Sequence, residues 1–463
     1  MAKFWDSRDN RPNSYVSGTI AKSADVNGNE TFLEKYRSFN NLLVVDTDGI
    51  EDTNCDKTTV QGAIDQAVSD GIGYHIFIRV GTYDEDLDTF EAGVTLEGEN
   101  KSQSIILGNG AAEAITVDAN YITVDNLTIS KTTSAENAIQ VNGKSNFHLK
   151  NCIVTSDQTN STIYVLQAND TDLSNLIIEN CYIRNTALNS NPIISFQITS
   201  GSDDVNSTFK NISILNNKLV VDSLGNNKEL LRLEADTGTT TTKSEIFQVR
   251  ILGNRIYSEN AGTGYGIRIS VANNANCKIE EVTINNNLIN GSGGTDYGIY
   301  LYNAGASGTL DNIAIGSGNS IYVDSQKEIR LSTTYPTNFS TGGYWVDFTS
   351  IANWTGGGTM TFGTITTETA RFSIIGRTCY INAFVQGTTG GTASDNITFT
   401  VPVAFKESTQ YYNTGGCMAD DGSFYGGLYF NSNATLVAVK RYDNANFGLG
   451  AGRGFGVNFH YEI

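Results

Sequence analysis

The chain of 463 residues contains 30 Lys and Arg against 49 Asp and Glu, so its formal net charge is −19. This acidic balance argues against a nucleic-acid-binding protein, because neutralising phosphates requires a basic stripe. Only 17% of the residues are charged and 4 are Pro, whereas 47 are Gly and 10% are aromatic. Such a composition is typical of a long all-β protein with many turns and little helix.

Membrane proteins and disulfide scaffolds are disfavoured as well. No apolar run approaches the roughly 18 to 20 residues that a membrane span requires, so we expect no membrane insertion. The first residues lack the profile of a signal peptide, which predicts synthesis in a cytoplasm. The cysteines lie far apart without a C-x-x-C pair, which predicts free, mostly buried thiols. They are Cys55, Cys152, Cys181, Cys277, Cys379 and Cys417.

In chain order, residues 1–42 fit neither of the patterns that follow, and we expect an attachment segment or a lateral strap there. Residues 58–71, TTVQGAIDQAVSDG, predict a helix that caps the open end of a β-structure. Thr58 and Gln61 are a candidate capping box, and Gly71 stands where the helix would stop. The expected buried face consists of Val60, Ala63, Ile64, Ala67 and Val68. Ile76, Ile78 and Val80 then alternate as the inward side chains of a first strand.

A repeated phrase organises the middle of the chain. It reads VDNLTI, LKNCIV, IENCYI, LNNKLV, LGNRIY, INNNLI and GSGNSIY. One aligned column consists of Leu127, Cys152, Cys181, Asn217, Asn254, Asn287 and Asn319. Buried amides need partners, so this column predicts an interior asparagine ladder in which neighbouring side chains bond to one another and to the turn backbone.

A second phrase keeps the same interval and supplies another column of inward aliphatic residues. These are Ile115, Ile139, Ile194, Leu231, Ile267, Ile299 and Ile329. Two strands per unit, separated by variable Gly- and Asn-rich insertions, predict a right-handed parallel β-helix of about eight coils. We assign it residues 43–332.

After Leu331 the repeat ends, and residues 333–345, which include Pro336, are expected to form a linker. Residues 346–463 show period-2 alternation with Gly and Asn turns, which predicts an antiparallel, jelly-roll-like sandwich.

The order TVQGAIDQA, IFIRVGTYDE and VTLEGENKSQSIILG resembles the opening of pectin-lyase-like β-helix proteins, including pectinesterases and phage tailspikes. The segment from Trp354 to Pro402 resembles the terminal modules of phage tail fibres and tailspikes. The resemblance implies a homotrimeric virion appendage that recognises a bacterial surface polysaccharide, with other virion tail proteins bound through the N-terminus. The catalytic motifs of the family are missing: there is no Arg-Pro-Trp, and only Asp203 and Asp204 echo a polygalacturonase-like acid pair.

Carboxylates that flank one central strand are the best candidates for catalysis. Glycosidases need two carboxyl groups roughly 5 to 9.5 Å apart, a spacing that neighbours on a β-helix face can reach. The candidate catalytic residues are Glu229, Glu234 and Asp236. If Leu231 and Leu233 point inward, Arg232 and Glu234 point outward.

The same outward columns carry candidate glycan-binding residues, because arginine and tyrosine bind sugars by bidentate hydrogen bonds and ring stacking. They are Arg232, Arg268, Tyr300, Tyr302 and Arg330, with Ser195, Gln197 and Ser270 beside them. A subunit interface uses the same residue types and remains an alternative.

Three functions therefore stay open: an adhesin whose β-helix is a rigid shaft, an endo-acting polysaccharide depolymerase, and a purely structural head fibre. We favour the adhesin and expect no cofactor. The acidic stretch Asp46, Asp48, Glu51 and Asp52 lacks the spacing of an EF-hand, and the three histidines are scattered, so we expect no metal.

Overall fold

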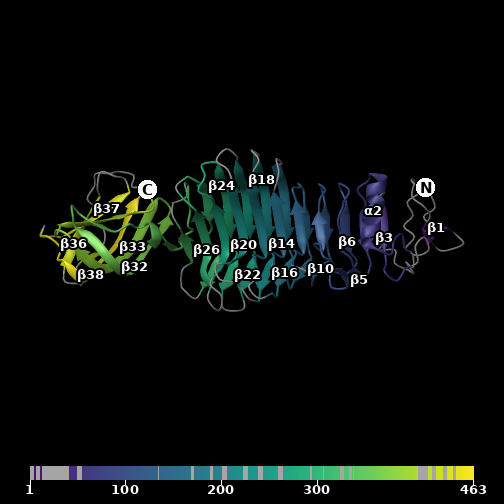
Figure 1. Ribbon diagram of the computed structural model, residues 1–463, viewed down its shortest axis with the longest axis horizontal. Coiled ribbons are helices and arrows are strands. Elements are labelled where there is room, and N and C mark those ends of the chain that lie inside the picture. The colour runs from purple at the N-terminus through teal and green to yellow at the C-terminus, as the bar shows by residue number, and fades with distance from the viewer. Residues whose placement is uncertain are drawn as a thin grey trace.

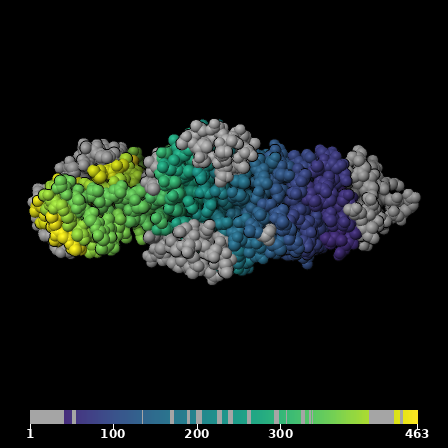
Figure 2. Space-filling model, viewed as in Figure 1, coloured from purple at the N-terminus to yellow at the C-terminus, as the bar shows by residue number. Residues whose placement is uncertain are grey.

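The computed structural model shows an elongated rod built from three parallel sheets, with an antiparallel module at one end (Figure 1). It describes residues 5–6, 11–12, 41–49, 55–133, 135–167, 172–187, 191–200, 206–222, 228–237, 243–258, 264–291, 295–305, 307–323, 328–332, 336, 338–404, 416–419, 424–430, 435–441 and 445–463. The colour bands succeed one another along the rod in chain order, so that each coil forms one transverse slice (Figure 2). The predicted right-handed parallel β-helix is confirmed.

Sheet 1 has ten strands and carries the longest run of coils. Its strands are β3 (Leu42–Val45), β4 (His75–Ile78), β6 (Thr95–Gly98), β9 (Thr123–Asp125), β12 (His148–Lys150), β15 (Asp172–Glu179), β18 (Ser207–Leu215), β21 (Ser244–Leu252), β24 (Cys277–Asn285) and β27 (Thr309–Ile315).

Sheet 2 has nine strands, all short. They are β5 (Gly81–Asp84), β7 (Ser104–Gly108), β10 (Thr128–Lys131), β13 (Ile153–Ser156), β16 (Tyr182–Asn185), β19 (Lys218–Val221), β22 (Arg255–Ser258), β25 (Leu288–Gly291) and β28 (Ser320–Val323).

Sheet 3 completes each coil and leads into the terminal module. Its parallel strands are β8 (Ile115–Val117), β11 (Ile139–Asn142), β14 (Ile163–Gln167), β17 (Ile194–Ser200), β20 (Lys228–Thr237), β23 (Gly264–Val271), β26 (Thr295–Asn303), β29 (Ile329–Leu331) and β30 (Val346–Asp347).

Each full coil therefore contains three strands, as in β21, β22 and β23, and the predicted two strands per unit were wrong. Within each copy of the repeated phrase, the chain turns sharply from sheet 1 into sheet 2. The corner residue has a left-handed backbone, with φ near +55° at Asn126, Asn151, Asn180, Asn216 and Asn286, and +70° at Gly253. Asn and Gly tolerate this conformation best, which explains the first polar residue of each pair.

The residue after the corner forms the asparagine ladder, which is confirmed. Asn254 Oδ1 accepts hydrogen bonds from the backbone N–H of Asn217 at 2.9 Å and from Asn217 Nδ2 at 3.1 Å. Asn254 Nδ2 donates to the Ile214 carbonyl at 2.8 Å and to Asn287 Oδ1 at 3.0 Å. The same pattern continues to Asn319. The side chains of Cys152 and Cys181 occupy the column on the earlier coils and are buried.

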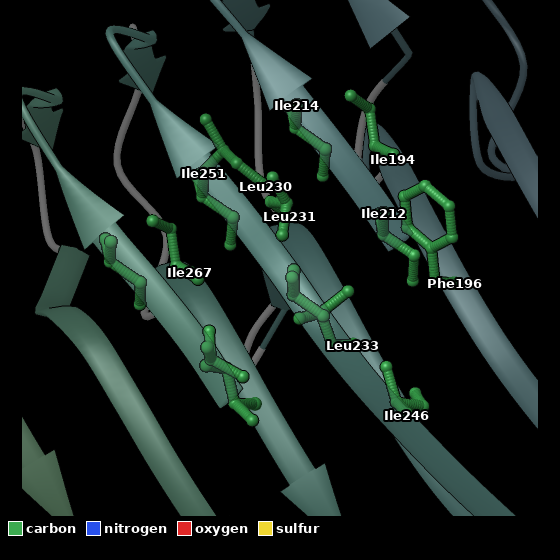
Figure 3. Close-up of a cluster of buried hydrophobic side chains, with 14 of the residues drawn as sticks. Ile194, Phe196, Ile212, Ile214, Leu230, Leu231, Leu233, Ile246, Ile251 and Ile267 are labelled. Atoms are coloured by element: carbon green, nitrogen blue, oxygen red, sulfur yellow. The ribbon is translucent and has the colours of Figure 1, made fainter. Parts of the chain in front are cut away.

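The aliphatic column is also buried as predicted, and Figure 3 shows Ile194, Leu231 and Ile267 on successive strands of sheet 3. The predicted series skipped one coil. Ile163 of β14 lies in register between Ile139 and Ile194, and its phrase had not been recognised.

The predicted helix is α2 (Val60–Asp70), and it covers the end of the rod. Its N-cap is Thr59, whose side chain accepts from the Gly62 N–H, so the predicted capping box of Thr58 and Gln61 was wrong. Glu85 occupies the helix start instead and accepts from the backbone N–H of residues 60 and 61. Gly71 ends the helix at φ +63°, as predicted.

Two predicted inward residues point to solvent, since Val68 is 38% and Val80 is 42% exposed. Strand β4 ends at Ile78, before Val80, and it is preceded by β3, which is the first parallel strand.

The terminal module is an antiparallel sandwich. One layer orders its strands β32-β33-β38-β35 and the other β31-β34-β37-β36. Its elements are η1 (Thr349–Ile351), β31 (Thr355–Gly356), β32 (Thr361–Ile375), β33 (Thr378–Gly390), β34 (Asn396–Thr400), β35 (Gly416–Ala419), β36 (Phe424–Phe430), β37 (Leu436–Arg441) and β38 (Gly450–Glu462). Phe399 packs edge-on against Phe459 across the layers, and Trp354 stacks on Phe399.

Strand β30 joins the two parts, because it pairs in parallel with β29 and antiparallel with β32. Near the other end, β1 (Trp5–Asp6) pairs with β2 (Arg11–Pro12), and most of the proposed attachment segment lies outside the described residues. In the described ranges, none of the helices has the length and apolar character needed to cross a bilayer.

Candidate functional site

The outer face of sheet 3 gathers nearly all of the predicted site residues. Parallel register places Arg232, Arg268, Tyr300 and Arg330 on successive strands in one column. A second column, two residues further along each strand, holds Gln197, Glu234, Ser270 and Tyr302. Leu231 and Leu233 point inward, so their neighbours Arg232 and Glu234 point outward, as predicted. We call this surface the sheet-3 site.

Glu229 lies at the bottom of the sheet-3 site and is fully buried. Arg232 donates to Glu229 Oε2 from Nη2 at 2.6 Å and from Nε at 3.0 Å. Arg268 Nη1 donates to Glu229 Oε1 at 2.6 Å. Two guanidinium groups thus neutralise one carboxylate, which offsets the cost of removing it from water. Glu229 orients the two arginines.

Glu234 lies higher on the same strand, with its side chain 19% exposed. Its Oε2 accepts from Gln197 Nε2 at 2.7 Å and from Arg232 Nη1 at 3.4 Å. The Tyr164 hydroxyl in turn donates to Gln197 Oε1 at 2.9 Å. Burial, and secondarily the charge of Glu234, raises the pKa of Tyr164, so this phenol stays protonated as a donor. Asp236, by contrast, is exposed and takes no part in these hydrogen bonds.

A tyrosine cluster adjoins the two charged columns. The rings of Tyr265 and Tyr300 stack with their centroids 4.4 Å apart, and the ring of Tyr297 lies 5.8 Å from that of Tyr265. All three side chains are buried, with Tyr300 only 7% exposed, whereas Tyr302 at the edge is half-buried. Burial raises the pKa of Tyr265 and of Tyr300. Most of the ring surface is therefore already used inside the cluster.

Two arginines lie over these rings. The Arg268 guanidinium lies 4.9 Å from the Tyr302 centroid, and that of Arg330 lies 4.7 Å from the Tyr297 centroid. Burial by itself would lower the pKa of Arg268, but Glu229 outweighs it and the net shift is upward. Arg268 Nε is buried and has no hydrogen-bond acceptor in the described part of the chain. Arg330 is half-buried, and no described carboxylate forms an ion pair with it.

Three members of the site were not predicted from the sequence: Tyr164, Tyr265 and Tyr297. Tyr164 belongs to the coil that was skipped. The other two stand in a repeated Tyr-Gly-Ile phrase, at residues 265–267 and 297–299, which was a visible signal. The glycine is needed because a Cβ on Gly298 would lie 2.3 Å from Ile321 Cγ2.

The other acidic candidates do not join this surface. Asp46 bonds to Arg79 and to the backbone N–H of Asp48, while Glu51, Asp52, Asp203 and Asp204 lie outside the described residues. His75 pairs with Glu97, and His148 pairs with Glu179, on separate coils. Over the described ranges, no group of three or more His, Cys, Asp or Glu could hold a metal ion.

The fold is a parallel β-helix of three sheets followed by an antiparallel module. The chain matches no protein-family model and no curated protein. It is similar in structure to a pectin methylesterase from carrot, at a TM-score of 0.34 and 15% identity, over 65% of this chain and 83% of that one. It is similar to the Dettilon tailspike protein at a TM-score of 0.27 and 10% identity, over 91% and 94%. For the tailspike protein gp49 of Pseudomonas phage LKA1 the TM-score is 0.32 and the identity 12%, over 84% and 65%. Likenesses of this degree concern the fold and do not extend to activity.

Proposed function

We propose that the protein is a glycan-binding adhesin of a phage virion, with the β-helix as a stiff shaft and the sheet-3 site as a contact for host-surface polysaccharide. The observation that carries the proposal is the row of partly exposed Arg232, Glu234, Tyr302 and Arg330, each in contact with side chains of its own or a neighbouring strand. Guanidinium, carboxylate and phenol groups bind sugar hydroxyls best when they are fixed before binding.

The charge network favours binding over catalysis. A general acid must hold a proton that it can give to the leaving group. Glu229 is buried beneath two guanidinium groups, and Glu234 accepts hydrogen bonds from Gln197 and Arg232. Both carboxylates are thus already engaged by side-chain donors of the protein, which suits anchoring the surrounding side chains better than chemistry on a substrate.

A depolymerase is the second candidate, because the spacing of one pair of carboxylates is compatible with glycoside hydrolysis. Glu234 and Asp236 lie on the same face of β20, two residues apart, which corresponds to roughly 6.7 Å along a strand. That spacing lies at the lower edge of the range for inverting glycosidases, roughly 6.5 to 9.5 Å. A water molecule between the two groups would complete such a site.

The virion assignment draws on the sequence resemblance of the opening segment and of residues 354–402 to phage appendages. A rod that ends in a compact antiparallel module also suits a role in which one end attaches and the other reaches outward.

The test is binding of the purified full-length protein to a panel of bacterial capsular and O-antigen polysaccharides. We expect Arg330→Ala and Tyr302→Ala each to weaken binding by about tenfold, because each removes a contact group and leaves the fold intact. Glu234→Gln should retain binding, since the amide keeps the shape and most hydrogen bonds. The exposed Tyr322 on sheet 2 supplies a matched control, as Tyr322→Ala should bind normally.

Release of new reducing ends or unsaturated uronates from any of these polysaccharides would contradict the adhesin assignment. If Glu234→Gln then abolishes the release and retains binding, the depolymerase takes its place.

A further inference from the structure

A second surface, on sheet 1 and not on sheet 3, forms an open groove. It crosses the outer face of sheet 1 over β15, β18, β21, β24 and β27, and its volume is about 580 Å³. Five strands at the usual spacing make the groove roughly 19 Å long. We call it the sheet-1 groove.

The groove arises from a kink that recurs at the same position in all five strands. Its wall residues have a left-handed backbone, with φ of +56° at Asn211, +57° at Gln248 and +55° at Glu281. Strand pairing skips these positions, since Phe247 and Val249 pair with their neighbours while Gln248 does not. Asn tolerates this conformation, but Gln and Glu adopt it at a cost. Residues other than Asn and Gly that hold a strained, left-handed backbone are often found at functional surfaces.

Most of the side chains along the groove are polar, and they differ in whether they already have partners. At one end Asn211 Nδ2 donates to Asn175 Oδ1 at 3.0 Å. The floor of the groove carries Ser213, Arg250 and Thr283 in one register column. Arg250, Gln248 and Glu281 are exposed, and none of them makes a hydrogen bond or ion pair within the described part of the chain. This differs from the sheet-3 site, where Arg232 and Arg268 are both held by Glu229.

The hydrogen-bonding groups and the charge of the groove indicate which class of ligand it would bind. Amides and hydroxyls donate and accept at once, as sugar hydroxyls do, and a guanidinium can bind two neighbouring oxygens. A polyanion is disfavoured, because the chain carries −19 and Glu281 stands beside the one arginine of the floor. An extended peptide would need unpaired backbone groups at a sheet edge, whereas the groove lies on a sheet face.

We propose that the sheet-1 groove is a separate binding site for a linear, neutral, hydroxyl-rich polysaccharide. Gln248 and Glu281 contact it from the wall and Arg250 from the floor. This site does not depend on the sheet-3 site. A polysaccharide that contacts both sites would bind with higher avidity, because the two faces are held at a fixed spacing.

The experiment measures binding of the full-length protein to immobilised neutral O-antigen polysaccharides and, in parallel, to acidic capsular polysaccharides. The variants are Arg250→Ala and the pair Gln248→Asn with Glu281→Asn. The Asn substitutions suit the left-handed backbone better, so the melting temperature should stay equal or rise while the longer side chains are lost. We expect each variant to weaken binding to a neutral polysaccharide by about tenfold or more.

The matched control is Arg255→Ala, which removes another exposed arginine from β22 of the same coil and should bind normally. Groove variants that bind every neutral polysaccharide as well as the unchanged protein, or a protein that binds none of them, would overturn the proposal. A change of molecular mass in light scattering would assign the groove to contact between copies of the chain instead. Loss of binding in the groove variants, with Arg330→Ala and Tyr302→Ala unaffected, would refute the sheet-3 proposal alone.

Discussion

Asn254 illustrates how a polar side chain is accommodated inside the rod. It is fully buried, and its amide contacts the coil before it and the coil after it. Each ladder asparagine satisfies the backbone N–H of its predecessor, so the column works only as a continuous series. An isolated buried amide would cost free energy, whereas a fully connected network does not.

We expect Asn254→Leu to lower the free energy of unfolding by about 1–3 kcal/mol, because the N–H of Asn217 and the carbonyl of Ile214 would lose their partners. Thermal or urea unfolding measures the change. The control is the corner residue next to the ladder: Asn216→Gly keeps the left-handed turn and should leave stability nearly unchanged. A variant as stable as the parent protein would show that the ladder contributes no net stability.

At this scale the sequence predicts contacts that continue along one column and misses contacts that join different columns. The asparagine column was found because its residues recur beside aliphatic neighbours. The burial of Tyr300 could not be predicted, because it depends on Tyr265, which stands three residues before Arg268 and on a different column. The partners of Glu229 were equally hidden, since they come from two strands.

Strand β20 is the element on which the sheet-3 site is built. Within ten residues it supplies the buried Glu229, the bridging Arg232 and the partly exposed Glu234. Its outward charges are tied to the next strand through Arg268 and to the previous one through Gln197. A change at Glu229 should therefore affect the whole face.

We predict that Glu229→Gln lowers the free energy of unfolding by about 2–4 kcal/mol, because two mostly buried guanidiniums would lose their counter-charge. Denaturant unfolding measures this loss. Glu245→Gln, on the neighbouring strand β21, is the control and should change stability by less than about 0.5 kcal/mol. Equal stabilities of the two variants would contradict the role given to Glu229.

Helix α2 was predicted correctly, whereas the division of each coil into three strands was not, and the difference has a physical reason. A left-handed residue at the corner turns the chain without interrupting the alternation of inward and outward side chains, so β21 and β22 look like one strand in the sequence. Helix α2 was recognisable because its apolar spacing and Gly71 are local signals. Its N-cap is Thr59, one residue after the predicted position, and the contribution of Glu85 was not predicted because Glu85 comes from a distant segment.

For the whole molecule we predict a homotrimer. The resemblance to phage appendages and the polar, aromatic outer faces both suit side-by-side association of rods. Light scattering should give three times the chain mass of 50.0 kDa. A stable monomer at that mass would contradict the prediction, and the proposed glycan contacts would then have to act within one chain.

The direction of the strands has a mechanical consequence. The strands lie across the long axis of the rod, so the hydrogen bonds between coils point along it (Figure 1). The asparagine ladder runs in the same direction. A pull at the tip therefore loads these bonds in tension and separates coils one after another, whereas a push presses together side chains that are already in contact. We therefore expect the shaft to give way more readily under tension than under compression.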